Sequence, residues 1–360
     1  MESKVTIYAE KTALVDVLEK AFDDGNIVEI FKRHATICIN MDDLEVKEVF
    51  RPESFENIDI LCTLFNAFGI KEPVALKHYI DGLRETEDSV LSDPNALFLR
   101  DCSKEEAKAI REKYGVWVLN SEEMSNKRLF ELFSFGYSFE PREKYGSGNN
   151  GWASIISQNK LVVPPSNSLV IYDNHLLDTD RNGIIVGLAN LIHLFDAILP
   201  HNLDANMTYY ILVMCPGTNR ENDMTRVVEK WKEEVLAYLK RQYTIAIEFV
   251  FSKKVIHERI LFMNHAYIKT EKGFKIFFPY SNVALKDGDE INSVEMDMYL
   301  SNPQKAGETK YAYASTRINK IKAAYKDARD NYDNNVSIIG VTKFVGTPLT
   351  ESEYPNSIFY

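Results

Sequence analysis

Basic and polar side chains concentrate in residues 253–275 of this chain. His257 and Arg259 lie two positions apart at the start of a predicted strand, so both side chains are expected on one face of it. An arginine fork binds phosphate through two hydrogen bonds, and an imidazole can donate a proton or act as a nucleophile. Five lysines surround the pair: Lys253, Lys254, Lys269, Lys272 and Lys275. The pattern predicts a phosphate site, although a structural pairing of His257 or Arg259 with Asp173 or Glu248 stays open.

The same stretch resembles the H-x-K-x4-D motif of the phospholipase D superfamily. His257 stands at the histidine position, Arg259 at the lysine position and Asn264 at the aspartate position. The order of H-E-R before K-G-F looks more like a variant branch, the phospholipase-D-like C-terminal domain of MIT-domain proteins and its bacterial relatives. Residues 168–177, SLVIYDNHLL, are similar to the first strand of such domains. The resemblance covers about residues 165–345.

This resemblance implies a site in which His257 is the candidate nucleophile and Arg259 holds phosphate. We assign further phosphate contacts to four residues: Asn264, Lys254, Thr270 and Lys272. Asn264 cannot supply the carboxylate that tunes the histidine in that family. The chain has one copy of a motif that the family uses twice, so catalysis would need a homodimer.

The branch is associated with binding of phosphate-bearing ligands or partners more than with their hydrolysis, and its bacterial relatives suggest a component of a defence system. Three functions therefore stay open. The first is a binding protein for nucleic acid or another phosphate-bearing ligand. The second is a phosphodiesterase or nuclease, and the third is a protein–protein adaptor.

A second basic segment lies at residues 305–329, with seven basic and two acidic side chains and interleaved tyrosines. Basic side chains beside aromatic rings suit phosphate tracking and base stacking. The candidate nucleic-acid patch consists of Arg317, Lys320, Lys322 and Lys326. The alternative is an amphipathic helix with a solvated basic face, in which Ile318, Ile321, Ala324 and Tyr325 pack against the core.

Acidic residues dominate the first part of the chain. Residues 1–150 hold 19 basic and 29 acidic side chains, whereas residues 151–360 hold 23 and 24, so nearly all of the net charge of −11 lies in the first part. Asp42, Asp43 and Asp101 follow predicted strands, where carboxylates can hold Mg²⁺ or Mn²⁺ in metal-dependent nucleases. They are weak metal candidates, because acids at such places also cap helices and keep a surface soluble. An acidic face could also dock a partner protein.

The elements expected to position these residues form an α/β layer fold in two domains, residues 1–150 and 160–360. A Gly/Asn-rich segment at 145–151 and a Pro-Pro pair at 164–165 mark the joint. In the first domain, strands at 34–40, 95–99 and 116–119 accompany helices at 12–22 and 104–114. The second helix has a capping box of Ser103 and Glu106 and ends before Gly115. The second domain alternates strands at 168–172, 208–214, 244–251 and 259–263 with helices, and a late helix covers 311–330.

Four widely spaced cysteines and the absence of a signal-like apolar run favour a soluble, cytoplasmic protein. We expect no cofactor, because the sequence contains neither a Walker loop nor a G-x-G-x-x-G motif.

Overall fold

The computed structural model describes residues 4–21, 34–40, 87–125, 136–139, 151–158, 163–179, 185–217, 221–253, 255–271, 273–274, 294–300, 309–330, 343–346 and 355–359. The protein is α/β, as predicted, with one parallel and one mixed sheet. It divides into two compact units. The first unit comprises Met1–Phe135 with Met298–Tyr313, and the second comprises Gly136–Asp297 with Ala314–Tyr360. The predicted domains at 1–150 and 160–360 stay a prediction.

The first unit is built on a four-stranded sheet in the order β2-β1-β3-β4, in which all neighbours are parallel. The strands are β1 (Val5–Ala9), β2 (Ala35–Ile39), β3 (Leu97–Arg100) and β4 (Trp117–Asn120). Its helices are α1 (Lys11–Ala21), α6 (Lys104–Tyr114), α7 (Ser121–Ser125) and the 3₁₀ helix η1 (Glu87–Ser92). β4 is buried along its whole length, as is typical of strands that helices cover on both faces.

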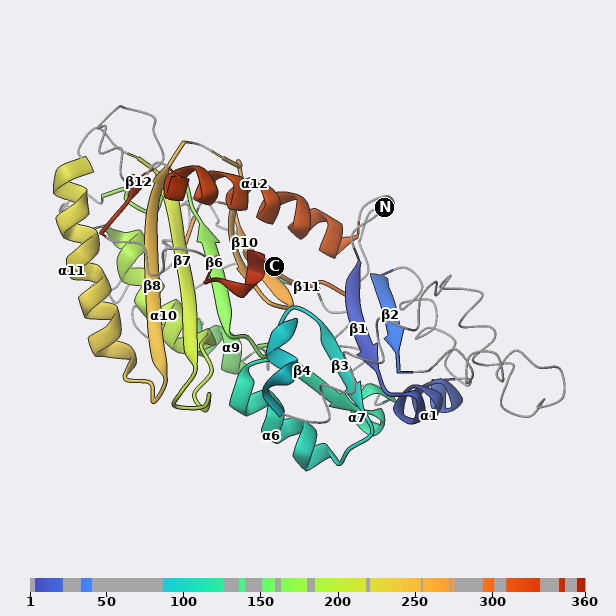
Figure 1. Ribbon diagram of the computed structural model, residues 1–360. Helices are drawn as coiled ribbons and strands as arrows, with labels where there is room; N and C mark the ends of the chain where they lie inside the picture. The colour runs from blue at the N-terminus through green and yellow to red at the C-terminus, as the bar shows by residue number, and fades with distance from the viewer. Residues whose placement is uncertain are drawn as a thin grey trace, which may run out of the picture. The chain divides into compact units, whose positions relative to one another are not determined.

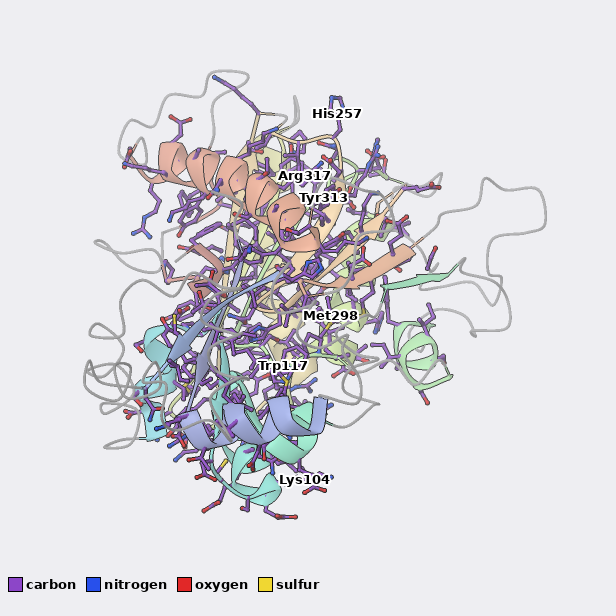
Figure 2. The ribbon with its side chains drawn as sticks, turned by 90° about the vertical axis from the view of Figure 1, so that its right-hand side faces the viewer. Lys104, Trp117, His257, Met298, Tyr313 and Arg317 are labelled. Atoms are coloured by element: carbon purple, nitrogen blue, oxygen red, sulfur yellow. The ribbon has the colours of Figure 1, made fainter. Side chains whose placement is uncertain are left out.

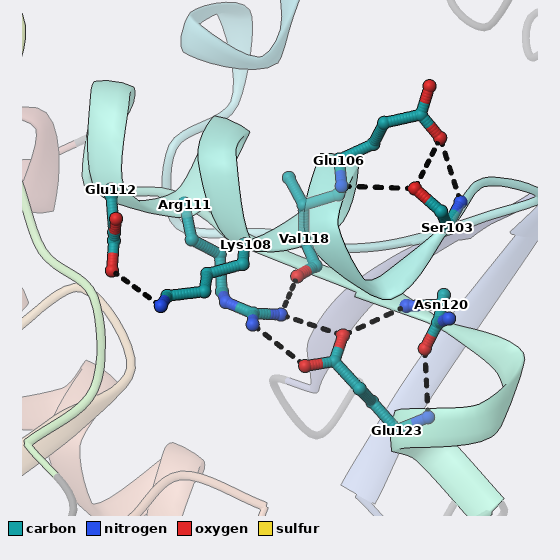
Figure 3. Close-up of polar contacts among 8 residues, drawn as sticks. All are labelled: Ser103, Glu106, Lys108, Arg111, Glu112, Val118, Asn120 and Glu123. Carbon is teal, nitrogen blue, oxygen red and sulfur yellow. Dashed lines mark hydrogen bonds and ion pairs between the residues drawn. The ribbon is translucent and has the colours of Figure 1, made fainter.

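Helix α6 begins and ends as its sequence predicts. The Ser103 hydroxyl accepts from the Glu106 backbone N–H, and the Ser103 N–H donates to the Glu106 carboxylate (Figure 3). Gly115 ends the helix in the left-handed region, with φ 64°. In the last turn, Arg111 donates to both carboxylate oxygens of Glu123, at 2.9 and 2.7 Å. This fork joins α6 to α7.

The second unit is built on an eight-stranded mixed sheet in the order β12-β8-β7-β6-β9-β10-β11-β5. Its strands are β5 (Gly136–Phe139), β6 (Ser168–Tyr172), β7 (Thr208–Pro216), β8 (Thr244–Ser252), β9 (Arg259–Met263), β10 (Ala266–Thr270), β11 (Val294–Met298) and β12 (Lys343–Phe344). Its helices are α9 (Gly151–Gln158), α10 (Val186–Ile198), α11 (Glu221–Leu239), α12 (Lys310–Asp330) and the 3₁₀ helix η5 (Ser357–Phe359). Met298 of β11 and the first residues of α12 belong to the first unit.

The strands β8, β7 and β6 lie side by side in this sheet, next to the edge strand β12 (Figure 1). They are parallel and follow one another through α10 and α11. Buried aromatic residues fill the core beneath them, and the Trp231 indole donates to the Leu188 carbonyl at 2.8 Å, which joins α11 to α10. In the part of the chain that the structure describes, no helix combines the length and the apolar character needed to cross a membrane.

Candidate functional site

The carboxyl ends of β6, β7 and β8 meet at one edge of the eight-stranded sheet. β9 runs antiparallel to β6 and pairs Tyr172 with Ile260, so Arg259 at the start of β9 lies at this same edge. β10 returns to it, because Thr270 pairs with Arg259. In open α/β sheets this edge is where ligands bind, at the point where the strand order reverses. We call Asp173, Asn174, His175, Arg259 and Gly273 the carboxyl-edge cluster.

Arg259 is the central cation of this cluster. Its Nη1 donates to the Glu271 carbonyl at 2.9 Å, and its Nη2 donates to Nε2 of His175 at 2.7 Å. Its Nε is buried and has no hydrogen-bond partner among the described residues. Within the described ranges, Arg259 forms no ion pair, whereas other arginines do: Arg111 with Glu123, Arg241 with Asp196 and Arg317 with Glu258. A guanidinium without a carboxylate partner keeps its charge available for a ligand.

His175 connects Arg259 to an acidic side chain. Its Nδ1 lies 2.9 Å from Oδ2 of Asp178. A guanidinium can only donate, so Nε2 of His175 must accept and the imidazole proton must sit on Nδ1. The imidazole is therefore neutral and donates to Asp178. This chain of three side chains holds the Arg259 guanidinium in one orientation.

Asp173 fixes the backbone of the carboxyl-edge cluster through hydrogen bonds. Its carboxylate accepts the backbone N–H groups of His175 at 2.7 Å and Phe274 at 2.8 Å. Burial raises the pKa of Asp173, while these two hydrogen bonds and the nearby charge of Arg259 act in the opposite direction. Gly273 has φ +95°, and a Cβ there would lie 2.8 Å from Oδ2 of Asp173. Only glycine suits this close approach.

His257 does not share a strand face with Arg259, so that prediction is wrong. β9 begins at Arg259, and His257 lies in the bend before it, where the backbone alternation of a strand does not apply. Its side chain is exposed and projects outward from the second unit (Figure 2). Asn174 holds its backbone by donating to the His257 carbonyl at 3.4 Å. Among the described residues, no carboxylate forms an ion pair with His257.

Asn264 lies at the other end of β9, so its predicted place beside His257 and Arg259 is wrong. Its Oδ1 accepts from the backbone N–H of Asn167 at 3.0 Å, and its Nδ2 donates to Oγ of Ser357 at 3.0 Å. β9 has five residues, and at roughly 3.3 Å per residue it separates its two ends by about 15 Å. Asn264 therefore ties β9 to the start of β6 and to η5.

The remaining predicted phosphate contacts fall into two groups. Thr270 does lie at the edge beside Arg259, but its buried hydroxyl accepts from the Gly273 N–H at 3.0 Å and so supports the turn. Lys254 and Lys272 lie outside the described residues. The structure also describes the two carboxylates that were predicted as alternative partners of His257 or Arg259. Asp173 belongs to the carboxyl-edge cluster, and Glu248 accepts from the Tyr325 hydroxyl at 2.5 Å.

The candidate nucleic-acid patch on α12 is largely engaged within the protein. Arg317 donates to Glu258 from Nε and Nη2, at 3.0 and 2.8 Å. Lys322 donates to the Phe359 carbonyl, and Lys326 pairs with Asp330 one turn later. Lys320 is exposed. Ile321 and Tyr325 are buried, as the amphipathic alternative predicts, whereas Ile318 and Ala324 are only half-buried.

The acidic candidates of the first part are only partly described. Asp42 and Asp43 lie outside the described residues. Asp101 is exposed after β3, and its backbone N–H donates to Glu10 at 2.8 Å. Among the residues that the structure describes, no group of three or more His, Cys, Asp and Glu side chains could hold a metal ion.

Sequence reasoning missed His175 as a member of the site, and it named Asp173 only as a structural partner of His257 or Arg259. A signal for both exists, because they follow the buried strand SLVIY at the edge where ligands bind.

No family model matches the chain, and no curated protein is similar enough to count as a match.

Proposed function

We propose that the second unit binds a phosphate-bearing ligand at the carboxyl-edge cluster, with Arg259 as its main contact. The observation that carries this proposal is the state of the Arg259 guanidinium. It lies at a ligand-binding edge, it is held by a carbonyl and a neutral imidazole, and no carboxylate among the described residues pairs with it. This arrangement keeps the positive charge for an anion, and a phosphate matches the two-pronged donor geometry of arginine.

Binding is favoured over hydrolysis by the surroundings of the two histidines. His257 is exposed, and within the described part of the chain no acidic group orients it as a nucleophile. The Nε2 lone pair of His175 is already engaged by Arg259. A phosphodiesterase would need one of these imidazoles free and oriented beside the phosphate. The phospholipase-D-like identity, the homodimer, the partner on the acidic first part and a role in defence stay predictions.

The experiment is a binding titration of the full chain with a fluorescent, 5′-phosphorylated single-stranded oligonucleotide, followed by anisotropy at two salt concentrations. Arg259→Ala should weaken binding by at least about tenfold, because a charge-assisted contact is lost. The matched control is Arg226→Ala on α11, which removes an exposed arginine and should leave the affinity unchanged. Thermal melts of both variants establish that they remain folded.

The salt dependence distinguishes one local site from an extended surface. A site that neutralises one or two phosphates gives a shallow slope of about −1 in log affinity against log salt, whereas tracking along α12 gives a steeper one. Equal affinities of the wild type and folded Arg259→Ala would overturn the proposal. A steep slope that Lys320→Ala reduces would place the ligand on α12 instead.

A further inference from the structure

The contact between Arg259 and His175 presents a difficulty for an incoming anion. Nε2 of His175 accepts from Nη2 of Arg259 at 2.7 Å. A ligand oxygen that takes over this donor would face the lone pair of Nε2, and two lone pairs repel each other. A proton added to Nε2 removes the repulsion, because the same nitrogen then becomes a second donor toward the oxygen.

The surroundings of His175 can accommodate that proton. In the part of the chain that the structure describes, the charged groups that face it are Asp178 from the same turn, Asp173 from the end of β6 and Arg259 from the start of β9. Nδ1 already lies 2.9 Å from the Asp178 carboxylate, so this acceptor is in place for an imidazolium. Among the described residues that face His175, Arg259 is the group that opposes the new charge, and a bound anion between the two cations offsets that repulsion.

We propose that the site selects a terminal phosphate monoester and that its binding adds one proton from solvent to Nε2 of His175. This inference rests on the proposed function. A phosphate monoester carries between about −1.5 and −2 charges at neutral pH, whereas an internal phosphodiester carries one. The attraction to Arg259 and to the imidazolium grows with the charge of the ligand, so the dianion gains more from the added proton. The ligand is therefore the phosphorylated end of a molecule, and the site does not follow a nucleic-acid backbone.

The test uses two thymidine dinucleotides and the full chain. One carries a 5′-phosphate, and the other has only the internal phosphodiester. Isothermal titration slightly above neutral pH, in two buffers of different ionisation enthalpy, gives both the affinity and the number of protons taken up. The wild type should bind the 5′-phosphorylated probe at least about tenfold more tightly than the other, with uptake of roughly one proton per ligand.

The variant His175→Gln tests the contribution of the proton that His175 takes up. A glutamine carbonyl can still accept from Arg259, but it cannot be protonated, so the proton uptake should disappear. The preference for the terminal phosphate should shrink to the part that Arg259 alone provides. The matched control is His201→Gln, which replaces an exposed histidine after α10 and should behave as the wild type.

The possible outcomes separate the two proposals. If both probes bind equally through Arg259 without proton uptake, this inference is wrong and the proposed function stands. Proton uptake that persists in His175→Gln also overturns the inference. If neither probe binds the wild type, or if Arg259→Ala binds both unchanged, the proposed function fails and the inference fails with it.

Discussion

The close approach of Gly273 to Asp173 allows a quantitative test of how the carboxyl-edge cluster is built. In Gly273→Ala, the residue must keep φ +95° and its Cβ would lie 2.8 Å from the Asp173 carboxylate. A left-handed backbone conformation costs an alanine about 1–2 kcal/mol. The contact adds more, because two backbone N–H groups hold the buried carboxylate in place. We expect a total loss of about 2–4 kcal/mol in the free energy of unfolding of the second unit.

The second unit also supplies a matched control. Gly346 has φ +82°, but a Cβ there would meet no atom of the described residues within 4 Å. Gly346→Ala should therefore cost only the backbone contribution of about 1–2 kcal/mol. The assay is urea unfolding followed by circular dichroism and tryptophan fluorescence, together with phosphate binding of both variants. If Gly273→Ala costs no more than Gly346→Ala and binds ligand normally, the tight packing beneath the site is refuted.

Three further predictions concern individual side chains. Asn264→Ala should lower the free energy of unfolding by about 1–3 kcal/mol, because its buried hydrogen bonds are lost. The affinity for phosphate should stay unchanged, because Asn264 lies at the other end of β9 from Arg259. Weaker phosphate binding in a folded variant would contradict this placement. The stability that Asp173 contributes through its raised pKa is fully present below its ordinary pKa of 3.8 and is lost as the pH rises through the raised native pKa. Asp173→Asn should therefore remove this fall in stability with rising pH, and parallel unfolding curves of variant and wild type across that range would refute it. In the first unit, Arg111→Ala should lower the free energy of unfolding by about 2 kcal/mol, because it breaks the two-pronged, largely buried pair with Glu123 (Figure 3). Lys108→Ala breaks an exposed pair with Glu112 and should lower it by at most about 0.5 kcal/mol. Equal losses in urea unfolding would contradict this difference.

Local sequence signals predict much of the fold. β6 and β9 have the predicted bounds, because each is a short apolar run between polar residues. The start and end of α6 follow from Ser103, Glu106 and Gly115, whose effects are confined to the helix termini. β1 was not predicted, although its residues alternate between buried and half-buried positions.

The candidate site is harder to predict, because it depends on contacts between residues distant in the sequence. Arg259 is identified by its own chemistry, but its partner His175 lies 84 positions earlier in the chain. Asn264 illustrates the reverse case, in which residues close in the sequence lie far apart in the structure. Residues five positions apart look close in a sequence, yet a strand carries them to opposite edges of a sheet. The order of the strands, which places β9 beside β6, decides both cases.

The central claim is that Arg259 holds a phosphate at the carboxyl edge of the eight-stranded sheet. A crystal structure of the full chain with a dinucleotide that ends in a 5′-phosphorothioate tests it most directly, because anomalous scattering locates the sulfur. The account predicts a sulfur peak beside Arg259, with a ligand oxygen within hydrogen-bond distance of both Nη2 of Arg259 and Nε2 of His175. A sulfur peak elsewhere, with the contacts of Arg259 to His175 and Glu271 intact, would contradict it.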